Sequence, residues 1–139
     1  MEPLRRGAEP LAEMYFRDQK WRELEPILDM LVRKADRRDT KELNQLYYRL
    51  AKTADQIGNS DKALKYYKAA YDLDSTFLPT LLGRAALLYR IEDWEGSFKL
   101  YQTVLVHHRE AQKESEVVDI FYRLGVIKLK QGERKKALN

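Results

Sequence analysis

The sequence contains no cysteine, and it has only four prolines and six glycines among its 139 residues. The absence of cysteine excludes a disulfide framework and thiolate-ligated metals. Hydrophobic residues make up 44% of the chain and charged residues 35%. This composition excludes a disordered or fibrous chain and is typical of a soluble helical protein. The length suits one domain with a hydrophobic core.

The sequence also lacks long hydrophobic runs and a strong charge bias. Its most apolar region, residues 77–89, is interrupted by Pro79 and Arg84, so no stretch reaches the length of a membrane span. Residues 1–10 lack the apolar core of a secretory signal, which favours a cytoplasmic location. The net charge of +4 arises from 26 basic and 22 acidic residues that are interspersed, whereas nucleic-acid binders usually concentrate their basic residues on one surface.

Hydrophobic residues recur with the period of about 3.6 residues that indicates amphipathic helices. The clearest stripe on one helix face consists of Leu43, Leu46, Tyr47, Leu50, Ala51, Ala54 and Ile57. Asp39 is placed to cap the start of this helix, Gly58 to end it, and residues 59–61 to begin the next. No period of two residues is evident, so the sequence predicts an all-α protein.

One spacing recurs along the chain, namely a glycine, four residues and then Ala-Leu. It is present at residues 58–64 and again at residues 132–138. Ser97 and Leu24 stand where Ala63 stands in the first copy, so the anchors Leu24, Ala63, Ser97 and Ala137 are separated by 39, 34 and 40 residues. This interval predicts an array of helical hairpins, with longer loops near Arg37 and Gln112.

Residues 44–77 resemble a tetratricopeptide repeat. The signature positions hold Tyr47, Leu50, Ala51, Ala54, Gly58, Ala63, Tyr67, Ala70 and Ser75, of which Ala51, Ala54 and Ser75 depart from the usual pattern. Phe121, Leu124, Gly125 and Gly132 resemble the first half of the same pattern. The resemblance implies a right-handed α-solenoid of antiparallel hairpins, forming one domain over residues 1–139. About three and a half hairpins are expected, at 8–36, 40–74, 78–110 and 115–139, the last incomplete.

The last nine residues, QGERKKALN, read as a turn at Gly132 followed by the start of a second helix. We expect the chain to be a section of a longer array, and residues 133–139 to be poorly packed or held by a neighbouring molecule. The small residues at the repeat positions are expected where helices approach closely; these are Ala51, Ala63, Ala70, Ala85 and Gly125. The aromatic residues Tyr47, Tyr67, Tyr101 and Phe121 are expected to fill the space between helices.

The sequence offers little for catalysis. Its only histidines, His107 and His108, are adjacent and therefore point about 100° apart on a helix, which prevents the i, i+4 pairing of a helical metal site. They read as helix-end residues. No glycine-rich phosphate-binding motif is present, and most carboxylates lie beside cations, as on a solvated helix face. We therefore predict no enzymatic activity, no catalytic residue, no metal and no cofactor.

The resemblance implies that the first helix of each hairpin lines a concave groove that binds a peptide or a partner segment. The residues expected to face this groove are Tyr48, Arg49, Lys52, Gln56, Tyr89, Arg90, Tyr122, Arg123, Val126 and Lys130. Tyrosine precedes arginine three times in this set, and both residue types often anchor interfaces. The excess of basic charge predicts an acidic partner or a carboxylate terminus. Each tyrosine can equally be an ordinary, half-buried packing residue.

Two other functions compete with a binding groove. Self-association would use the exposed ends of the array, above all Phe121, Leu124 and Ile127 in a last hairpin that lacks a cap. RNA binding would use the basic residues near Arg33 and Arg37. A simpler interpretation of these cations is that they complement the dipole at a helix end.

Overall fold

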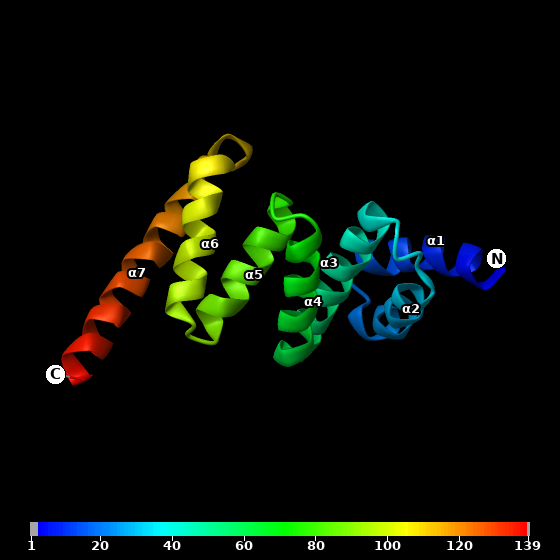
Figure 1. The fold of residues 1–139 in the computed structure, drawn as a ribbon, viewed down its shortest axis with the longest axis horizontal. Coiled ribbons are helices and arrows are strands. Elements are labelled where there is room, and N and C mark those ends of the chain that lie inside the picture. The colour runs from blue at the N-terminus through cyan, green and yellow to red at the C-terminus, as the bar shows by residue number, and fades with distance from the viewer. Residues whose placement is uncertain (1–2, 139) are drawn as a thin grey trace. The chain divides into compact units, whose positions relative to one another are not determined.

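The computed structural model describes residues 3–138, with side chains from residue 7 onward, and within this part of the chain it contains helices and no strand (Figure 1). The seven α-helices are α1 (Pro3–Arg17), α2 (Trp21–Lys34), α3 (Thr40–Ile57), α4 (Ser60–Leu73), α5 (Leu78–Arg90), α6 (Trp94–His107) and α7 (Glu114–Leu138). A short 3-10 helix, Arg109–Ala111, precedes α7. The predicted all-α class is confirmed.

The chain divides into two compact units, residues 1–80 and residues 81–139. The first unit contains α1 to α4 and the first turn of α5, and the second contains the rest of α5 with α6 and α7. The assignment of one domain to residues 1–139, with hairpins at the ranges given above, stays a prediction. Residues 1, 2 and 139 lie outside the described residues.

The turn between α3 and α4 forms as the sequence indicates. The Asp39 carboxylate accepts a hydrogen bond of 3.1 Å from the Glu42 backbone N–H and so caps α3. Gly58 ends α3 in the left-handed conformation, with φ of 100°, and its N–H donates to the Ala54 carbonyl. The Asn59 side chain then accepts from the Lys62 N–H at 3.1 Å and starts α4. Gly58 and the capping side chain of Asn59 therefore define this turn, while Asp39 fixes the other end of α3.

The same backbone turn recurs in the connections from α1 to α2, from α3 to α4 and from α5 to α6, although only one of them has glycine at the left-handed position. The left-handed residues are Gln19, Gly58 and Glu92, with φ of 58°, 100° and 65°. In each case the following N–H donates to the carbonyl five residues earlier; the bonds are Lys20 to Tyr15 at 2.9 Å, Asn59 to Ala54 at 2.8 Å and Asp93 to Leu88 at 2.8 Å. The repeat is thus more regular in its hydrogen bonds than in its sequence.

The small residues at the repeat positions pack as expected in four of five cases. Ala51, Ala63, Ala70 and Ala85 have no exposed surface. Ser97, which replaces alanine in the second unit, is also buried, and its hydroxyl donates to the Ala85 carbonyl at 2.9 Å. This bond satisfies a hydroxyl that would otherwise be costly to bury.

The expectations for Gly125 and Phe121 are wrong. Gly125 is exposed, and a Cβ at its position would meet no atom within 4 Å. Phe121 is 49% exposed and does not fill the space between helices. The reason is the rotation of α7, which buries Ile120 and Ile127, whereas Gly125 lies about 140° around the helix from Ile120. The other aromatic residues of the set agree with the expectation, because Tyr67 and Tyr101 are buried and Tyr47 is half-buried.

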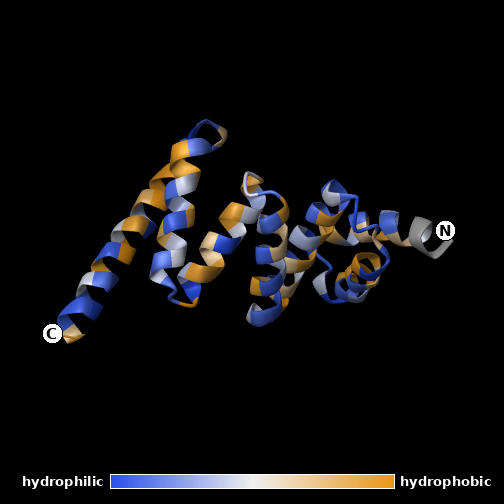
Figure 2. Ribbon diagram, viewed as in Figure 1, coloured by the Kyte–Doolittle hydropathy of each residue, from blue (hydrophilic) through white to orange (hydrophobic). Residues whose placement is uncertain are grey.

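The turn expected at Gly132 is not present either, because α7 continues through it from Glu114 to Leu138. Glu133 has no short polar side chain with which to start a new helix as Asn59 does after Gly58. Residues 133–138 are all exposed, as expected of a poorly packed segment, and Asn139 lies outside the described residues. The last turns of α7 are mostly hydrophilic before Leu138 (Figure 2).

A partly buried ion cluster joins α4 to α2 in the first unit. The Lys62 ammonium donates to Glu25 at 2.9 Å and to Asp29 at 3.1 Å. Burial alone lowers the pKa of Lys62, but the two carboxylates outweigh burial and raise it above its ordinary value. The cluster therefore keeps its charges while it links the first two hairpins.

Enlarging Ala63 to leucine is expected to destabilise the first unit by about 1–3 kcal/mol through overpacking, although leucine is a good helix former. Ala63 has no exposed surface and lies on α4, the helix that packs against α3. Chemical denaturation followed by circular dichroism measures the loss. The matched control is Lys65→Leu, at an exposed position of the same helix, which is expected to change stability by less than about 0.5 kcal/mol. Equal stability of the two variants would contradict close packing at Ala63.

Candidate functional site

In the first unit, the predicted groove residue Arg49 forms an ion pair with Glu13. Its two terminal nitrogens donate to the two carboxylate oxygens of Glu13 at 2.8 and 3.3 Å. Its guanidinium also lies 5.0 Å from the centre of the Phe16 ring. This fork-to-fork geometry connects α3 to α1. A ligand that used Arg49 would compete with Glu13.

The Glu13 to Arg49 pair gives the stability of the first unit a dependence on pH. Hydrogen bonding to Arg49, followed by its charge, lowers the pKa of Glu13 below its ordinary value. A carboxyl whose pKa is depressed in the folded state contributes stability that is complete above its unfolded pKa and is lost as the pH falls through its folded pKa. Because Glu13 is largely exposed, the contribution is small, about 0.2–1 kcal/mol as for other exposed pairs.

We therefore expect Glu13→Gln to be slightly less stable than the unmodified chain at pH 7, and the difference to vanish as the pH falls below the acidic range in which Glu13 titrates. Urea denaturation at a series of pH values measures this difference. Arg49→Gln should lose the same contribution, and combining both substitutions should add little more. A difference between the unmodified chain and Glu13→Gln that persists at pH 2 would exclude the ion pair as its cause.

Tyr48 is a packing residue in the first unit. Its ring lies 6.4 Å from Phe16, 6.4 Å from Tyr67 and 5.7 Å from Phe77, measured between ring centres. Burial raises the pKa of its hydroxyl above the ordinary value, while the Arg49 charge acts in the opposite direction. The aromatic contacts connect Tyr48 to α1, to α4 and to the loop before α5, and they leave the residue half-buried.

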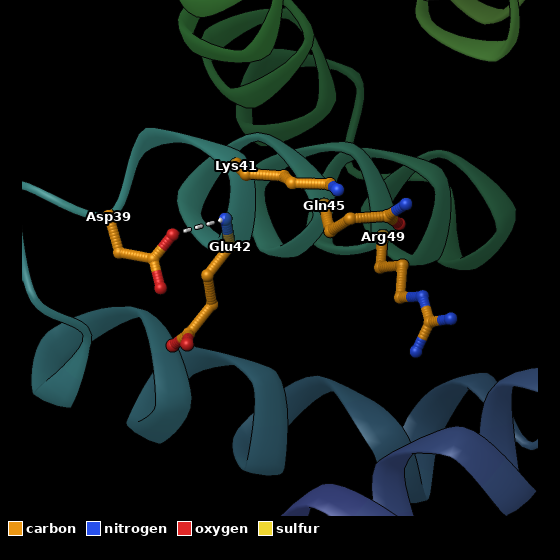
Figure 3. A pocket seen from close by; sticks show the side chains of 5 residues that line it. All are labelled: Asp39, Lys41, Glu42, Gln45 and Arg49. Atoms are coloured by element: carbon orange, nitrogen blue, oxygen red, sulfur yellow. Dashed lines mark hydrogen bonds between the residues drawn. The ribbon is translucent and has the colours of Figure 1, made fainter.

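A shallow pocket of about 380 Å³ lies along α3 and is lined by Asp39, Lys41, Glu42, Gln45 and Arg49. Figure 3 shows Glu42 and Arg49 projecting from α3 toward the helices of the first hairpin, with the Asp39 cap at one end. Gln56, seven residues after Arg49, is exposed and lines a separate pocket with residues 19–23 and Ile57. Lys52 between them is half-buried. Charges of both signs and internal pairing make this surface a poor anion site.

In the second unit, Arg123 is held by two tyrosines. Its guanidinium donates to the Tyr101 hydroxyl at 2.8 Å, and it lies 4.6 Å from the centre of the Tyr89 ring and 5.9 Å from that of Tyr101. Tyr89 is fixed in turn by an edge-on contact with Trp94, at 5.5 Å between ring centres. Residues from α5, α6 and α7 therefore fix the position of one cation.

The environment of Tyr101 is electropositive. Burial raises the pKa of its hydroxyl, and the charges of Arg123 and Arg90 act against that rise. The hydroxyl is consequently neutral near pH 7, and while it accepts from Arg123 its own hydrogen is free to donate. The sequence pattern predicts Tyr101 only as a core residue, and its position in the repeat gives no signal that its hydroxyl contacts Arg123.

A pocket of about 240 Å³ adjoins this cluster within the second unit. It is lined by Leu82, Ala86, Tyr101, Gln112, Glu116, Asp119, Ile120 and Arg123. Its lining combines an apolar part, Leu82 with Ala86 and Ile120, and a polar part around Arg123. Glu116 is engaged as a helix cap, because its carboxylate accepts from the Lys113 backbone N–H at 2.7 Å. Asp119 is exposed and provides the other acidic group of the lining.

The remaining predicted groove residues of the second unit differ in exposure and do not all lie on the same side of a helix as Arg123. Arg90 and Lys130 are exposed, and Val126 is half-buried. Tyr122 is 70% exposed and lies on a different side of α7 from Arg123, because adjacent helical residues diverge by about 100°. The Tyr-Arg pair at residues 122–123 is therefore not one binding element. The structure brings Arg123 together with Tyr89, which stand 34 positions apart in the sequence.

The helix-end interpretation of the two histidines is confirmed. His107 is the last residue of α6, and the His108 N–H donates to the Val104 carbonyl at 2.8 Å. Among the described residues, no group of three or more His, Asp or Glu could hold a metal ion. Likewise, none of the helices in this part of the chain has the length and hydropathy of a membrane span.

Comparison with known proteins agrees with the hairpin architecture. Residues 45–77 match the model of the tetratricopeptide repeat family. A crystal structure of PcrH from Pseudomonas aeruginosa is similar in fold, with a TM-score of 0.70 and 16% sequence identity over 92% of this chain and 94% of that chain. A search of curated proteins gives no match. The chain therefore shares the helical fold of PcrH, and its residues 45–77 match a tetratricopeptide repeat.

Proposed function

We propose that this chain is a protein-interaction module that binds an acidic segment of a partner protein at the pocket around Arg123. The tetratricopeptide repeat supports a protein-interaction scaffold in general. The observation that carries the more specific proposal is the fixed guanidinium of Arg123, at the edge of a pocket that also has an apolar lining. Arginine held in this way recognises carboxylates with two parallel hydrogen bonds.

Preorganisation favours Arg123 over the other arginines of the predicted groove. One of its N–H groups binds the Tyr101 hydroxyl and the Tyr89 ring supports its plane, so a ligand carboxylate needs to immobilise less of the side chain. The nearby charge of Arg90 adds to the attraction for an anion. Arg49, in contrast, already has a carboxylate partner in Glu13.

The apolar lining gives the pocket a second specificity. Leu82, Ala86 and Ile120 offer a surface for one hydrophobic side chain of the partner. Burying a side chain of the size of leucine or phenylalanine contributes about 1.5–3 kcal/mol. The preferred ligand is therefore a segment in which an acidic residue lies close to a large hydrophobic one.

Asp119 limits the affinity of this pocket for acids. Its carboxylate lines the same pocket as Arg123, so a bound acid experiences repulsion as well as attraction. Asp119→Asn should consequently strengthen the binding of acidic segments. A partner that bound through Asp119 in place of Arg123 would be basic. The sign of the ligand's charge therefore distinguishes binding through Arg123 from binding through Asp119.

Selection from a display library of random peptides tests the proposal without a known partner. The immobilised chain is expected to enrich peptides that combine Asp or Glu with a large hydrophobic residue, and Arg123→Gln is expected to lose this enrichment. Arg134→Gln, at an exposed position of the same helix, is the matched control and should retain it. Enrichment of Lys-rich or Arg-rich peptides, or an unchanged selection by Arg123→Gln, would refute the proposal.

A further inference from the structure

A line of exposed residues follows the side of α7 opposite its packed face. Val118, Tyr122 and Leu129 are 59%, 70% and 64% exposed, and Gly125 lies among them with no atom within 4 Å of its missing side chain. We call these four residues the α7 stripe. Ile120 and Ile127, which pack α7 in the second unit, lie about half a turn away around the helix.

The spacing of the α7 stripe is that of a helix-pairing seam. Its members are separated by four, three and four residues, the alternation of apolar positions in a coiled coil. This pattern reads the same in both directions along the helix. When two copies lie antiparallel, Val118 therefore faces Leu129 of the second copy, and Tyr122 faces Gly125, where the absent side chain leaves room for the ring.

The charges of α7 favour the same antiparallel arrangement. Residues 114–119 contain the acidic residues Glu114, Glu116 and Asp119 and no basic residue. Residues 128–136 contain one acidic residue, Glu133, and the basic residues Lys128, Lys130, Arg134, Lys135 and Lys136. Antiparallel pairing sets the acidic end of one helix against the basic end of the other, whereas parallel pairing sets like charges together.

We propose that the α7 stripe is a homodimerisation surface through which two copies of this chain associate with antiparallel α7 helices. The interface is isologous, as expected of a twofold dimer, since each stripe meets its own copy. Four stripe residues on one helix bury less area than the roughly 1,200–2,000 Å² of stable interfaces. The dimer is therefore weak, and its population depends on protein concentration and falls as salt rises.

Sedimentation equilibrium over a wide range of concentrations tests the association. The mean mass is expected to rise from the monomer value of 16.5 kDa toward twice that value as the concentration increases. Tyr122→Glu and Leu129→Glu should each remain monomeric with unchanged helix content, because both positions are exposed. Val106→Glu, at a 68% exposed position on α6 outside the stripe, is the control and should associate like the unmodified chain.

Cysteine pairing tests the register, because the chain has no cysteine of its own. A mixture of Val118→Cys and Leu129→Cys chains is expected to form the mixed disulfide in excess over either self-disulfide, since opposed positions bring the two Cα atoms within about 4.4–6.8 Å. A predominance of self-disulfides would instead show parallel pairing and overturn the proposal.

A mass that stays at 16.5 kDa at all concentrations would also overturn the proposed dimer. The α7 stripe would then be a surface for a different protein. The same holds if Tyr122→Glu and Leu129→Glu associate as strongly as the unmodified chain. Peptide selection by the Arg123 pocket is measured separately, at concentrations where the chain is monomeric. Failure of the dimer and failure of the proposed function are thus distinguishable.

Discussion

Replacement of Tyr67 by alanine is expected to lower the free energy of unfolding of the first unit by about 3–5 kcal/mol, the range observed when a buried aromatic side chain is truncated. Tyr67 is on α4, has no exposed surface and is among the largest fully buried side chains. Its ring lies 6.4 Å from that of Tyr48 on α3. Truncation therefore leaves a cavity between the two helices of the recognisable repeat.

The two tryptophans allow this loss to be assigned to the correct unit. Trp21 belongs to the first unit, where its ring lies 5.6 Å from Phe16, and Trp94 belongs to the second. Denaturation is followed by Trp21 fluorescence, with Trp94→Phe introduced into both the reference chain and the variant. Lys65→Ala, at an exposed position of the same helix, is the control and should change stability by less than about 0.5 kcal/mol. A loss below about 1 kcal/mol for Tyr67→Ala would contradict its place in the core.

Replacement of Arg123 by glutamine is expected to weaken the binding of a selected acidic peptide by roughly 10-fold to 150-fold. Hydrogen bonds to charged groups contribute about 1.5–3 kcal/mol, and each 1.4 kcal/mol corresponds to a factor of ten. The guanidinium concerned is the one held by Tyr101 and Tyr89. Isothermal titration calorimetry measures the affinity of each variant for the same peptide.

Two further variants separate the role of Arg123 from a general effect of charge. Arg123→Lys keeps the charge but not the planar fork, so it should recover only part of the affinity. Arg49→Gln removes the same charge from the first unit, where Glu13 neutralises it, and should leave the affinity unchanged. Equal losses for Arg123→Gln and Arg49→Gln would indicate a long-range charge effect and would contradict recognition at the pocket.

The sequence predicts helices and their ends well where one local interaction decides the outcome. Asp39 caps α3, Gly58 ends it and Asn59 starts α4, and each of these roles depends on residues at most five positions apart. The left-handed residues Gln19 and Glu92 escape prediction, because neither is glycine. They adopt the conformation because the packing of the hairpin demands it, at a cost of roughly 1–2 kcal/mol each.

The motif shared by residues 58–64 and 132–138 shows where local pattern fails. Both contain glycine followed after four residues by Ala-Leu, yet α3 ends at the first glycine and α7 continues through the second. After Gly58 comes the capping residue Asn59, and Ala63 is fully buried. After Gly132 comes Glu133, and residues 133–138 are all exposed, so no burial compensates for the hydrogen bonds that a turn would break.

The sequence predicts which residue types make up the candidate site, but it does not predict which residues contact one another there. The recurring Tyr-Arg pairs predict binding roles for Arg49 and Arg123, and both arginines make short polar contacts. Their partners, however, are Glu13 and Tyr101, which lie 36 and 22 positions away in the sequence. No local pattern encodes such pairings, so the sequence could not distinguish the arginine with a carboxylate partner from the one held by tyrosines.

The side-chain N–H resonances of the arginines, observed by nuclear magnetic resonance while a selected acidic peptide is titrated, give the most direct test of the binding site. The Nε–H resonance of Arg123 is expected to shift in proportion to occupancy, because a ligand carboxylate changes its hydrogen bonding. The resonance of Arg49 should stay in place, because its partner remains Glu13. A shift confined to Arg49, with Arg123 unmoved at saturation, would contradict the proposed site.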